Sequence, residues 1–169
     1  MNALTPRVPG APAVAVALLL VLLAGCGTTG GGSGNSGSVQ EIHLFGLPTA
    51  LTMAGSSVAG GVGVRIYASA SGGSKGLPLR QGTLEILLFD QSPTGLDAQT
   101  AKPLKIWSFA ASDLAPYQSS SLMGFGYQFE LQWDKDRPRG RVFTVIARFR
   151  PNPKTEIYST PAAIAIATH

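Results

Sequence analysis

The clearest pattern in the chain is an alternation of apolar and polar side chains over residues 125–133. The apolar positions are Phe125, Tyr127, Phe129, Leu131 and Trp133, and the positions between them are Gly126, Gln128, Glu130 and Gln132. A period of two places successive side chains on opposite faces of an extended strand. After residue 38 no segment keeps the 3.6-residue period of a helix. The chain is therefore expected to fold from β-strands.

Eight further segments complete the set of predicted strands. They are residues 39–45, 50–53, 62–69, 83–89, 105–109, 141–150, 156–159 and 163–167. Residues 83–89 are apolar on both faces over part of their length, which predicts a central strand, and residues 125–133 and 141–150 are predicted to pair as a hairpin. Ser112 is expected to cap one helical turn. Seven to nine short strands predict an all-β fold, an antiparallel immunoglobulin-like β-sandwich, with a small closed barrel as the alternative.

The N-terminal residues have the composition of a secretory signal peptide. Arg7 precedes an apolar run over residues 11–24. Fourteen residues are too few to span a bilayer core of about 30 Å, which needs about 20, but they suit a signal peptide. An uncleaved anchor helix and an apolar helix docked on the folded domain are the alternatives. The small residues at 24 and 25, Cys26 and the glycine-rich residues after it favour a cleaved signal peptide over both alternatives.

The apolar run ends in Leu23-Ala24-Gly25-Cys26, and Cys26 is the only cysteine of the chain. This segment resembles the lipobox, the processing site of bacterial lipoproteins. The resemblance implies that residues 1–25 are removed and that the Cys26 thiol receives a diacylglyceryl group, which anchors the protein to a membrane. It places the protein at the cell membrane or outer membrane, on the periplasmic or extracellular side. Gly27, in place of an Asp, slightly favours the outer membrane.

Residues 26–38 contain the lipidated cysteine and a linker. Six of the twelve residues from 27 to 38 are glycine, which predicts a disordered, flexible tether with a relaxed length of roughly 17–21 Å. The tether is expected to hold the folded domain just off the membrane. That domain is residues 39–169, which are enough for one core. Residues 103–133 and 141–149 are similar in general appearance to small lipoprotein β-sandwich domains, without a motif that identifies a catalytic residue.

Few residues have the spacing that chemistry at a site requires. The two histidines, His43 and His169, are far apart in sequence, so neither a metal site nor a cofactor is predicted, and His43 is expected on the outer face of a strand. No G-x-S-x-G, phosphate-binding glycine loop or H-E-x-x-H motif occurs, and the acidic residues are spread singly, so no catalytic residue is predicted. A net charge of +4 is too small to indicate nucleic-acid binding.

Two groups of residues are candidates for binding. The aromatic set is Trp107, Tyr117, Phe125, Tyr127, Phe129 and Trp133. The alternation predicts that most of these face the core, and Tyr117, in a loop beside Pro116, is predicted to be the most exposed. The basic group is Lys135, Arg137, Arg139, Arg141, Arg148, Arg150 and Lys154. It suits either a solvated edge strand or a surface for anionic lipid head groups or an acidic polymer.

These features together predict a cell-envelope lipoprotein with one non-catalytic binding or structural domain. Tyr117, Arg137 and Arg139 are the predicted binding residues, and the expected partner is an envelope protein or polysaccharide. The alternatives are an envelope hydrolase with a site built from loops, and a carbohydrate-binding module. The latter requires at least two aromatic side chains exposed on one face.

Overall fold

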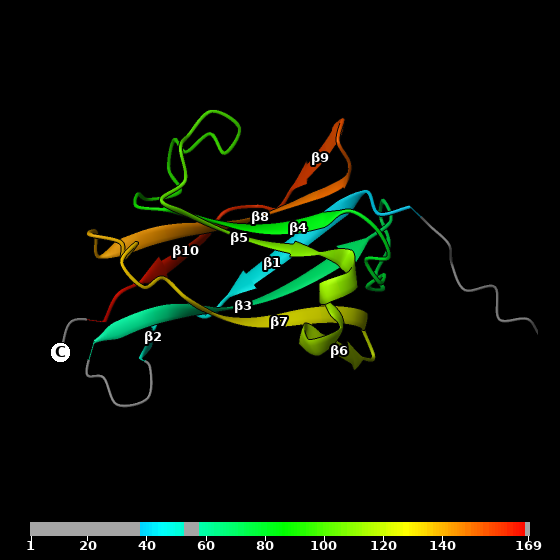
Figure 1. The fold of residues 1–169 in the computed structure, drawn as a ribbon, viewed down its shortest axis with the longest axis horizontal. Helices are drawn as coiled ribbons and strands as arrows, with labels where there is room; N and C mark the ends of the chain where they lie inside the picture. Colours follow the sequence, from blue (N-terminus) through cyan, green and yellow to red (C-terminus); the bar gives the residue numbers. More distant parts are fainter. Residues whose placement is uncertain (1–37, 53–57, 168–169) are drawn as a thin grey trace, which may run out of the picture. The chain divides into compact units, whose positions relative to one another are not determined.

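A computed structural model describes residues 38–52 and 58–167, and Figure 1 shows that these form two β-sheets packed face to face. The first sheet contains β1 (Glu41–Gly46), β3 (Ala59–Ser69), β7 (Gly124–Gln132) and β6 (Gln118–Ser121) in that order, with β2 (Leu51–Thr52) paired to β3. The second sheet contains β10 (Ala162–Ala165), β8 (Val142–Asn152), β4 (Thr83–Phe89) and β5 (Lys105–Ala110), with β9 (Thr155–Tyr158) paired to β8. All strand pairs are antiparallel.

The strand order is that of an immunoglobulin-like sandwich. Strands β1, β3, β7 and β6 correspond to strands A, B, E and D of that fold, and β4, β8 and β10 correspond to C, F and G. Strand β5 takes the place of the additional C′ strand. The predicted all-β sandwich is therefore confirmed, with ten strands in place of the expected seven to nine. The unpredicted strand is β6, whose sequence Gln-Ser-Ser-Ser has no apolar alternation.

The predicted hairpin between residues 125–133 and 141–150 is wrong. Strand β7 pairs with β3 and β6, whereas β8 pairs with β4, β9 and β10 in the other sheet. The physical reason is that residues 143–147 of β8 are buried without interruption. A strand that is apolar on both faces requires a central place in a covered sheet. The segment from Trp133 to Arg141 consequently crosses from one sheet to the other.

Two consecutive 3-10 turns, η1 (Ala111–Asp113) and η2 (Ala115–Tyr117), connect β5 to β6. They confirm the short helical turn predicted here. The predicted capping by Ser112 is wrong, because the residue at the N-cap is Ala110 and makes no side-chain capping bond. No helix in the part of the chain that the structure describes has the length and the apolar content needed to cross a bilayer.

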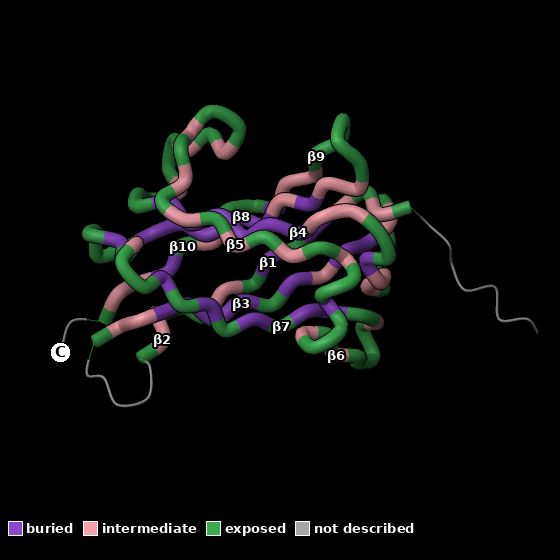
Figure 2. Tube along the Cα trace, in the orientation of Figure 1, coloured by how far each residue is buried: buried purple, intermediate pink, exposed green. Residues whose placement is uncertain are grey.

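The main core lies between the two sheets, where Figure 2 shows the buried segments. Its largest side chains come from β7 and its flanks, which confirms the inward face of the alternation for Tyr127, Phe129, Leu131 and Trp133. Trp133 packs edge-on against Phe143 of β8 with 5.4 Å between ring centroids. Fully burying an aromatic or aliphatic side chain of this size contributes about 1.5–3 kcal/mol.

A second, smaller core lies on the outer side of the second sheet. Leu87, Phe89 and Ile146 are buried there beneath the connection from β4 to β5 and beneath Tyr158 of β9. The connection, residues 90–104, contributes Leu96 and two alanines to this cover. Strand β4 is thus covered on both faces and lies between β8 and β5, which confirms the central strand predicted for residues 83–89.

The sandwich has two ends with different contents. At one, the tether end, lie Ser38, the start of β1, the connection from β3 to β4, the β6–β7 turn and the β8–β9 turn. At the other, the arginine end, lie the connections 90–104 and 133–141 and the last residues of β10. In Figure 1 the tether end is on the right and the arginine end on the left.

Candidate anion-binding site

A hollow of about 390 Å³ lies at the arginine end. Its lining residues are Arg137, Pro138, Arg139, Gly140, Arg141 and Ile166, and we call it the arginine hollow. Five of the six belong to the segment that crosses from the first sheet to the second. Because the crossing runs over the end of the core, the side chains of Arg137, Arg139 and Arg141 are exposed.

The start of the crossing is fixed by a buried aromatic ring and a tight turn. The Trp133 N–H donates to the Gly60 carbonyl at 3.2 Å, which extends the pairing of β7 with β3. The Asp136 N–H then donates back to the Trp133 carbonyl at 2.8 Å, and Asp134 between them has a φ of 50°. Aspartate is one of the few residues other than glycine that adopts this left-handed conformation readily. The crossing therefore starts from a rigid point.

Its remaining residues are held by Asp90, which directly follows β4. One carboxylate oxygen, Oδ1, accepts the backbone N–H of Arg139 at 2.8 Å and that of Gly140 at 3.0 Å. On the far side, the Ile166 N–H donates to the Arg141 carbonyl at 2.8 Å. Hydrogen bonds to a charged acceptor are the stronger kind, so the backbone beneath the three arginines is held in place.

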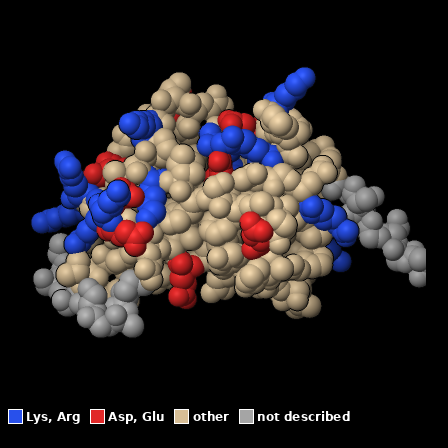
Figure 3. Space-filling model, viewed as in Figure 1, with Lys and Arg blue, Asp and Glu red and all other residues tan. Residues whose placement is uncertain are grey.

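The carboxylates near the hollow are already engaged by other groups. Lys105 Nζ lies 2.7 Å from Asp134 Oδ2 and 3.9 Å from Asp136 Oδ2, and Asp90 binds backbone N–H groups. None of the ion pairs among residues 38–52 and 58–167 includes Arg137, Arg139 or Arg141, and all three are exposed. Figure 3 shows basic side chains gathered at this end of the molecule.

This arrangement suits an anion. A guanidinium group presents a planar set of N–H donors that matches carboxylate, sulfate and phosphate oxygens, and it remains charged at every physiological pH. The hollow contains three such groups within five residues of chain. Because the three guanidinium groups are exposed, they remain hydrated and have no desolvation penalty in the free protein.

The structure brings together Arg137 and Arg139 from the predicted binding residues and adds Arg141. It does not bring Tyr117 to them. Tyr117 lies in η2 at the tether end, stacked on Phe129 at 4.6 Å between centroids and edge-on to Phe109 at 5.2 Å. The prediction that Tyr117 is the most exposed of the aromatic set is wrong, because the two 3-10 turns fold its ring back against the core. Phe125 is more exposed.

Trp107 and Phe125, two partly exposed members of the aromatic set, do not form a shared platform. Trp107 donates its Nε1–H to the Gln132 carbonyl at 3.1 Å, at the last residue of β7, whereas Phe125 lies near the first. Seven residues of extended strand separate these positions by roughly 24 Å. The geometry therefore gives no support to stacking of one sugar ring between them.

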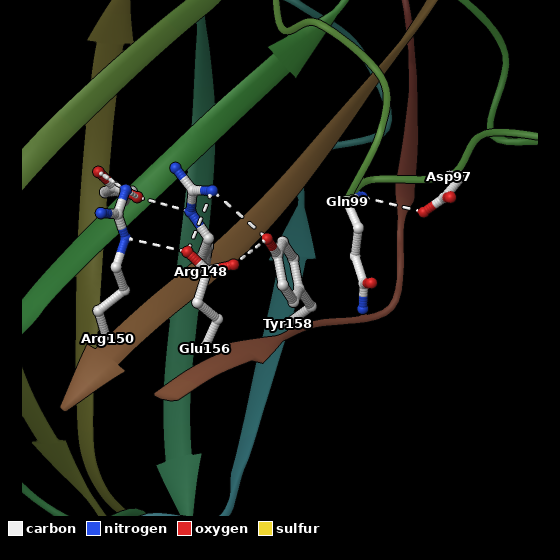
Figure 4. A network of polar contacts seen from close by, with 7 residues as sticks. Asp97, Gln99, Arg148, Arg150, Glu156 and Tyr158 are labelled. Carbon is white, nitrogen blue, oxygen red and sulfur yellow. Dashed lines mark hydrogen bonds and ion pairs between the residues drawn. The ribbon is translucent and has the colours of Figure 1, made fainter. Parts of the chain in front are cut away.

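The last part of the basic group forms a separate cluster on the outer side of the second sheet, shown in Figure 4. Glu85 of β4 lies between two arginines of β8, with Arg148 Nε at 2.6 Å and Arg150 Nη2 at 2.7 Å. Glu156 of β9 lies 3.5 Å from Arg148 and 3.4 Å from Arg150, and the Tyr158 hydroxyl donates to it at 2.5 Å. We call these five residues the glutamate–arginine cluster.

The charges of this cluster balance within it. Glu85 is only 7% exposed, and both of its oxygens receive guanidinium hydrogen bonds. Arg150 Nε is buried and close to Glu156 but outside hydrogen-bonding geometry, so Glu156 holds it by charge alone. Burial, and then the hydrogen bond to Glu156, raise the pKa of the Tyr158 hydroxyl. The cluster fastens β9 to the sheet and offers no free carboxylate for acid–base chemistry.

A second hollow, of about 560 Å³, lies beside the connection from β4 to β5. Its lining residues are Phe89, Asp90, Gln91, Ala101, Lys102, Pro103 and Leu104. Asp90 is engaged by the crossing segment, and Lys102 is the other charged residue. The hollow thus lacks the paired groups that a hydrolytic site requires.

His43, Ser69 and Glu41 meet on the outer face of β1 and β3. His43 Nε2 lies 3.1 Å from Ser69 Oγ and 3.6 Å from Glu41 Oε2. A catalytic relay requires the serine and the carboxylate on different ring nitrogens, whereas here both contact Nε2. The Ser69 side chain is also buried, so a substrate could not reach its hydroxyl. The contact is a cross-strand hydrogen-bond network, and the predicted outward position of His43 is confirmed.

Metal ligands do not gather anywhere in the described part of the chain, where no three His, Cys, Asp or Glu side chains could hold an ion. Cys26, the rest of residues 1–37, Met53 and His169 lie outside the described residues. No protein-family model matches the chain, and no curated protein matches its sequence.

Proposed function

We propose that the protein is a lipid-anchored module of the cell envelope that binds an acidic polymer through the arginine hollow. The anchor is the diacylglyceryl group expected on Cys26, and the binding groups are Arg137, Arg139 and Arg141. The module is non-catalytic: it holds its partner close to the membrane.

One observation carries this proposal. Three guanidinium groups with no ion-pair partner among residues 38–52 and 58–167 line one hollow on a backbone held by Asp90. Arg148 and Arg150, the other two arginines of the basic group, are neutralised by glutamates, whereas the three arginines of the hollow are not. Unpaired charge on a fixed backbone supports a ligand of opposite charge.

The position of the hollow favours a polymer over lipid head groups. The hollow lies at the opposite end of the sandwich from Ser38, where the tether joins. The central strands β3 and β8 have eleven residues each, which corresponds to about 36 Å. A domain held by its tether end therefore presents the arginines away from the membrane that bears the anchor.

The binding proposal is tested with a triple variant and a matched control. Arg137→Gln, Arg139→Gln and Arg141→Gln remove three charges at the arginine end, whereas Lys75→Gln, Arg80→Gln and Lys154→Gln remove three exposed charges at the tether end. Polygalacturonate and polyphosphate are the probes, and uncharged dextran is the negative control. We expect the first variant to lose affinity at least tenfold and to reduce the salt dependence of binding, and the second to bind as the wild type does. Equal losses in both variants would refute the site.

The anchor is tested separately. Cys26→Ala should abolish incorporation of labelled acyl chains and should leave the leader uncleaved. A cleaved Cys26→Ala product without acyl chains that stays in the membrane fraction as fully as the wild type would contradict the lipid anchor while leaving the arginine hollow unaffected.

A further inference from the structure

The β6–β7 turn carries two adjacent exposed apolar side chains, and one of them, Leu122, is the most exposed large apolar side chain among the described residues. Leu122 is fully exposed and Met123 is 58% exposed, between Ser121 on one side and Gly124 on the other. We call these two residues the apolar tip. Leucine at a turn contributes no turn geometry of its own, whereas glycine, asparagine, aspartate and serine do. The geometry of the turn therefore does not explain why its residues are leucine and methionine.

The tip is presented by a braced backbone. The Gly76 N–H donates to the Met123 carbonyl at 2.6 Å, and the Phe125 N–H donates to the Gly76 carbonyl at 3.1 Å. Gly124 has a φ of 88°, and a Cβ there would lie 2.5 Å from the Gly76 oxygen. Glycine is thus required for the close approach of the two loops. The hydrogen bonds between the two loops therefore hold the backbone of the turn in place, with Leu122 and Met123 outside the core.

The same loop connects the tip to the start of the tether. Gly76 belongs to the connection from β3 to β4, whose Ser71 N–H donates to the Gln40 side chain at 3.3 Å. Gln40 stands two residues from Ser38, where the described chain begins. The chain before Ser38 leads to Cys26 over the twelve residues of the tether. The apolar tip therefore lies at the end of the sandwich that the anchor holds nearest the membrane.

Positively charged side chains at the tether end also favour contact with a membrane surface. Lys75 is exposed and precedes the residue that braces the tip, and Lys154 is exposed at the β8–β9 turn. Lysines near an apolar protrusion add attraction to anionic head groups while their alkyl stems accommodate the interface.

We infer that Leu122 and Met123 enter the surface of the membrane to which Cys26 is attached. The inference rests on the lipid anchor proposed above. The occupant of the tip is a bilayer surface and neither a protein nor a second copy of the chain, because a tether with a relaxed length of roughly 17–21 Å keeps this end close to the bilayer. The anchor and the tip then form two points of contact, and the sandwich stands with the arginine hollow away from the membrane.

The depth of the tip is measured by fluorescence. Leu122→Trp keeps the tip apolar, and Thr94→Trp places the same fluorophore on the exposed connection from β4 to β5 as a matched control. The acylated full chain is reconstituted in phosphatidylethanolamine–phosphatidylglycerol vesicles with brominated acyl chains. After subtraction of the wild-type signal from Trp107 and Trp133, we expect at least a twofold quenching and a blue shift for Leu122→Trp, and neither for Thr94→Trp.

The outcomes separate this inference from the anchor. Acylated, vesicle-bound protein in which the tryptophan at 122 is not quenched would overturn the inference and leave the anchor standing. A blue shift that appears without vesicles and grows with protein concentration would also overturn it, because the tip would then be buried by a second copy. A Cys26 without acyl chains would overturn the anchor, and with it the placement of the tip.

A second measurement tests the contact without the fluorophore. In a Cys26→Ala protein prepared without the leader, residues 1–25, residual binding to the same vesicles should fall at least about tenfold on replacing Leu122 and Met123 by serine, since two apolar side chains no longer leave water. Ile106→Ser on β5, an exposed apolar residue elsewhere, is the control and should have no effect. Equal binding by all these proteins would contradict membrane entry.

Discussion

At the scale of single residues, Tyr127 shows how the core closes around one polar group. Its ring is buried between the sheets, and its hydroxyl accepts the Leu79 N–H at 2.7 Å. The bond holds the connection from β3 to β4 against the core. Burial raises the pKa of the Tyr127 hydroxyl, and the hydrogen bond from Leu79 offsets part of that effect.

Tyr127→Phe is expected to destabilise the domain by about 1–2 kcal/mol, because it leaves the buried Leu79 N–H without its acceptor. The same variant changes the response to alkali. The folded state holds the tyrosine proton more tightly than the unfolded state, so its contribution is complete below about pH 10 and is lost as the pH rises above that value. Urea unfolding between pH 7 and 11 should therefore show a smaller alkaline loss in Tyr127→Phe than in the wild type. Parallel pH profiles would contradict this.

Glu85 has the corresponding role among charged residues. It is the buried member of the glutamate–arginine cluster and faces two guanidinium groups. Glu85→Gln removes the charge but keeps the shape, and it should cost about 2 kcal/mol because Arg148 and Arg150 lose their closest counter-ion in a partly dry environment. Glu156→Gln, at a more exposed position, should cost clearly less. Urea titration of the two variants decides the order, and a larger loss in Glu156→Gln would be inconsistent with the cluster.

At the scale of elements, the sequence was sufficient to predict a strand that has one solvent-exposed and one buried face, or two buried faces. The alternation of 125–133 and the apolar run of 83–89 predicted β7 and β4 because burial imposes those patterns on any sheet. Strand β6 could not be predicted, because its four residues are all polar and show no alternation. They adopt a strand conformation because they pair with β7. The false hairpin has a similar origin: two neighbouring strands with apolar faces can lie side by side or face to face, and only the packing of β8 decides.

The same limit applies to the site. Arg137 and Arg139 stood out as part of a basic run, but nothing in that run separates them from Arg148 and Arg150. The separation depends on Glu85, more than sixty residues away in sequence, which neutralises one pair and not the other. The support from Asp90 is about fifty residues from the loop that it holds. Such contacts arise from topology and have no local signature in the chain.

Asp90 makes the crossing segment a testable element. Asp90→Ala removes the acceptor for two backbone N–H groups, so amide hydrogen exchange at Arg139 and Gly140 should accelerate at least about tenfold, corresponding to a loss of roughly 1.4 kcal/mol of local protection. Asp97→Ala, in the same connection but bonded to Gln99 and Thr100, is the control and should leave those two amides unchanged. Unaltered exchange in Asp90→Ala would show that the loop is held by other contacts.

At the scale of the whole molecule, the two ends of the sandwich have separate chemistry. The apolar tip and Ser38, where the described chain begins, lie at one end, and the arginine hollow lies at the other, with eleven-residue strands between them. The core that joins them is continuous from Trp133 at one end to Leu79 and Leu114 at the other. A rigid body of this kind would fix the direction of the arginine hollow once the proposed membrane contact of the apolar tip is made.

The length of those strands has an electrostatic consequence. At physiological ionic strength the potential of a charged surface decays over about 8 Å, so the roughly 36 Å of sandwich exceeds four decay lengths. If the domain stands on the membrane as proposed, anionic head groups neither attract nor screen the three arginines of the hollow. Binding of polygalacturonate to the anchored protein should be the same on vesicles with and without phosphatidylglycerol, and a dependence on lipid charge would mean that the hollow lies near the bilayer. In the proposed arrangement, the sandwich therefore separates the arginine hollow from the charge of the membrane.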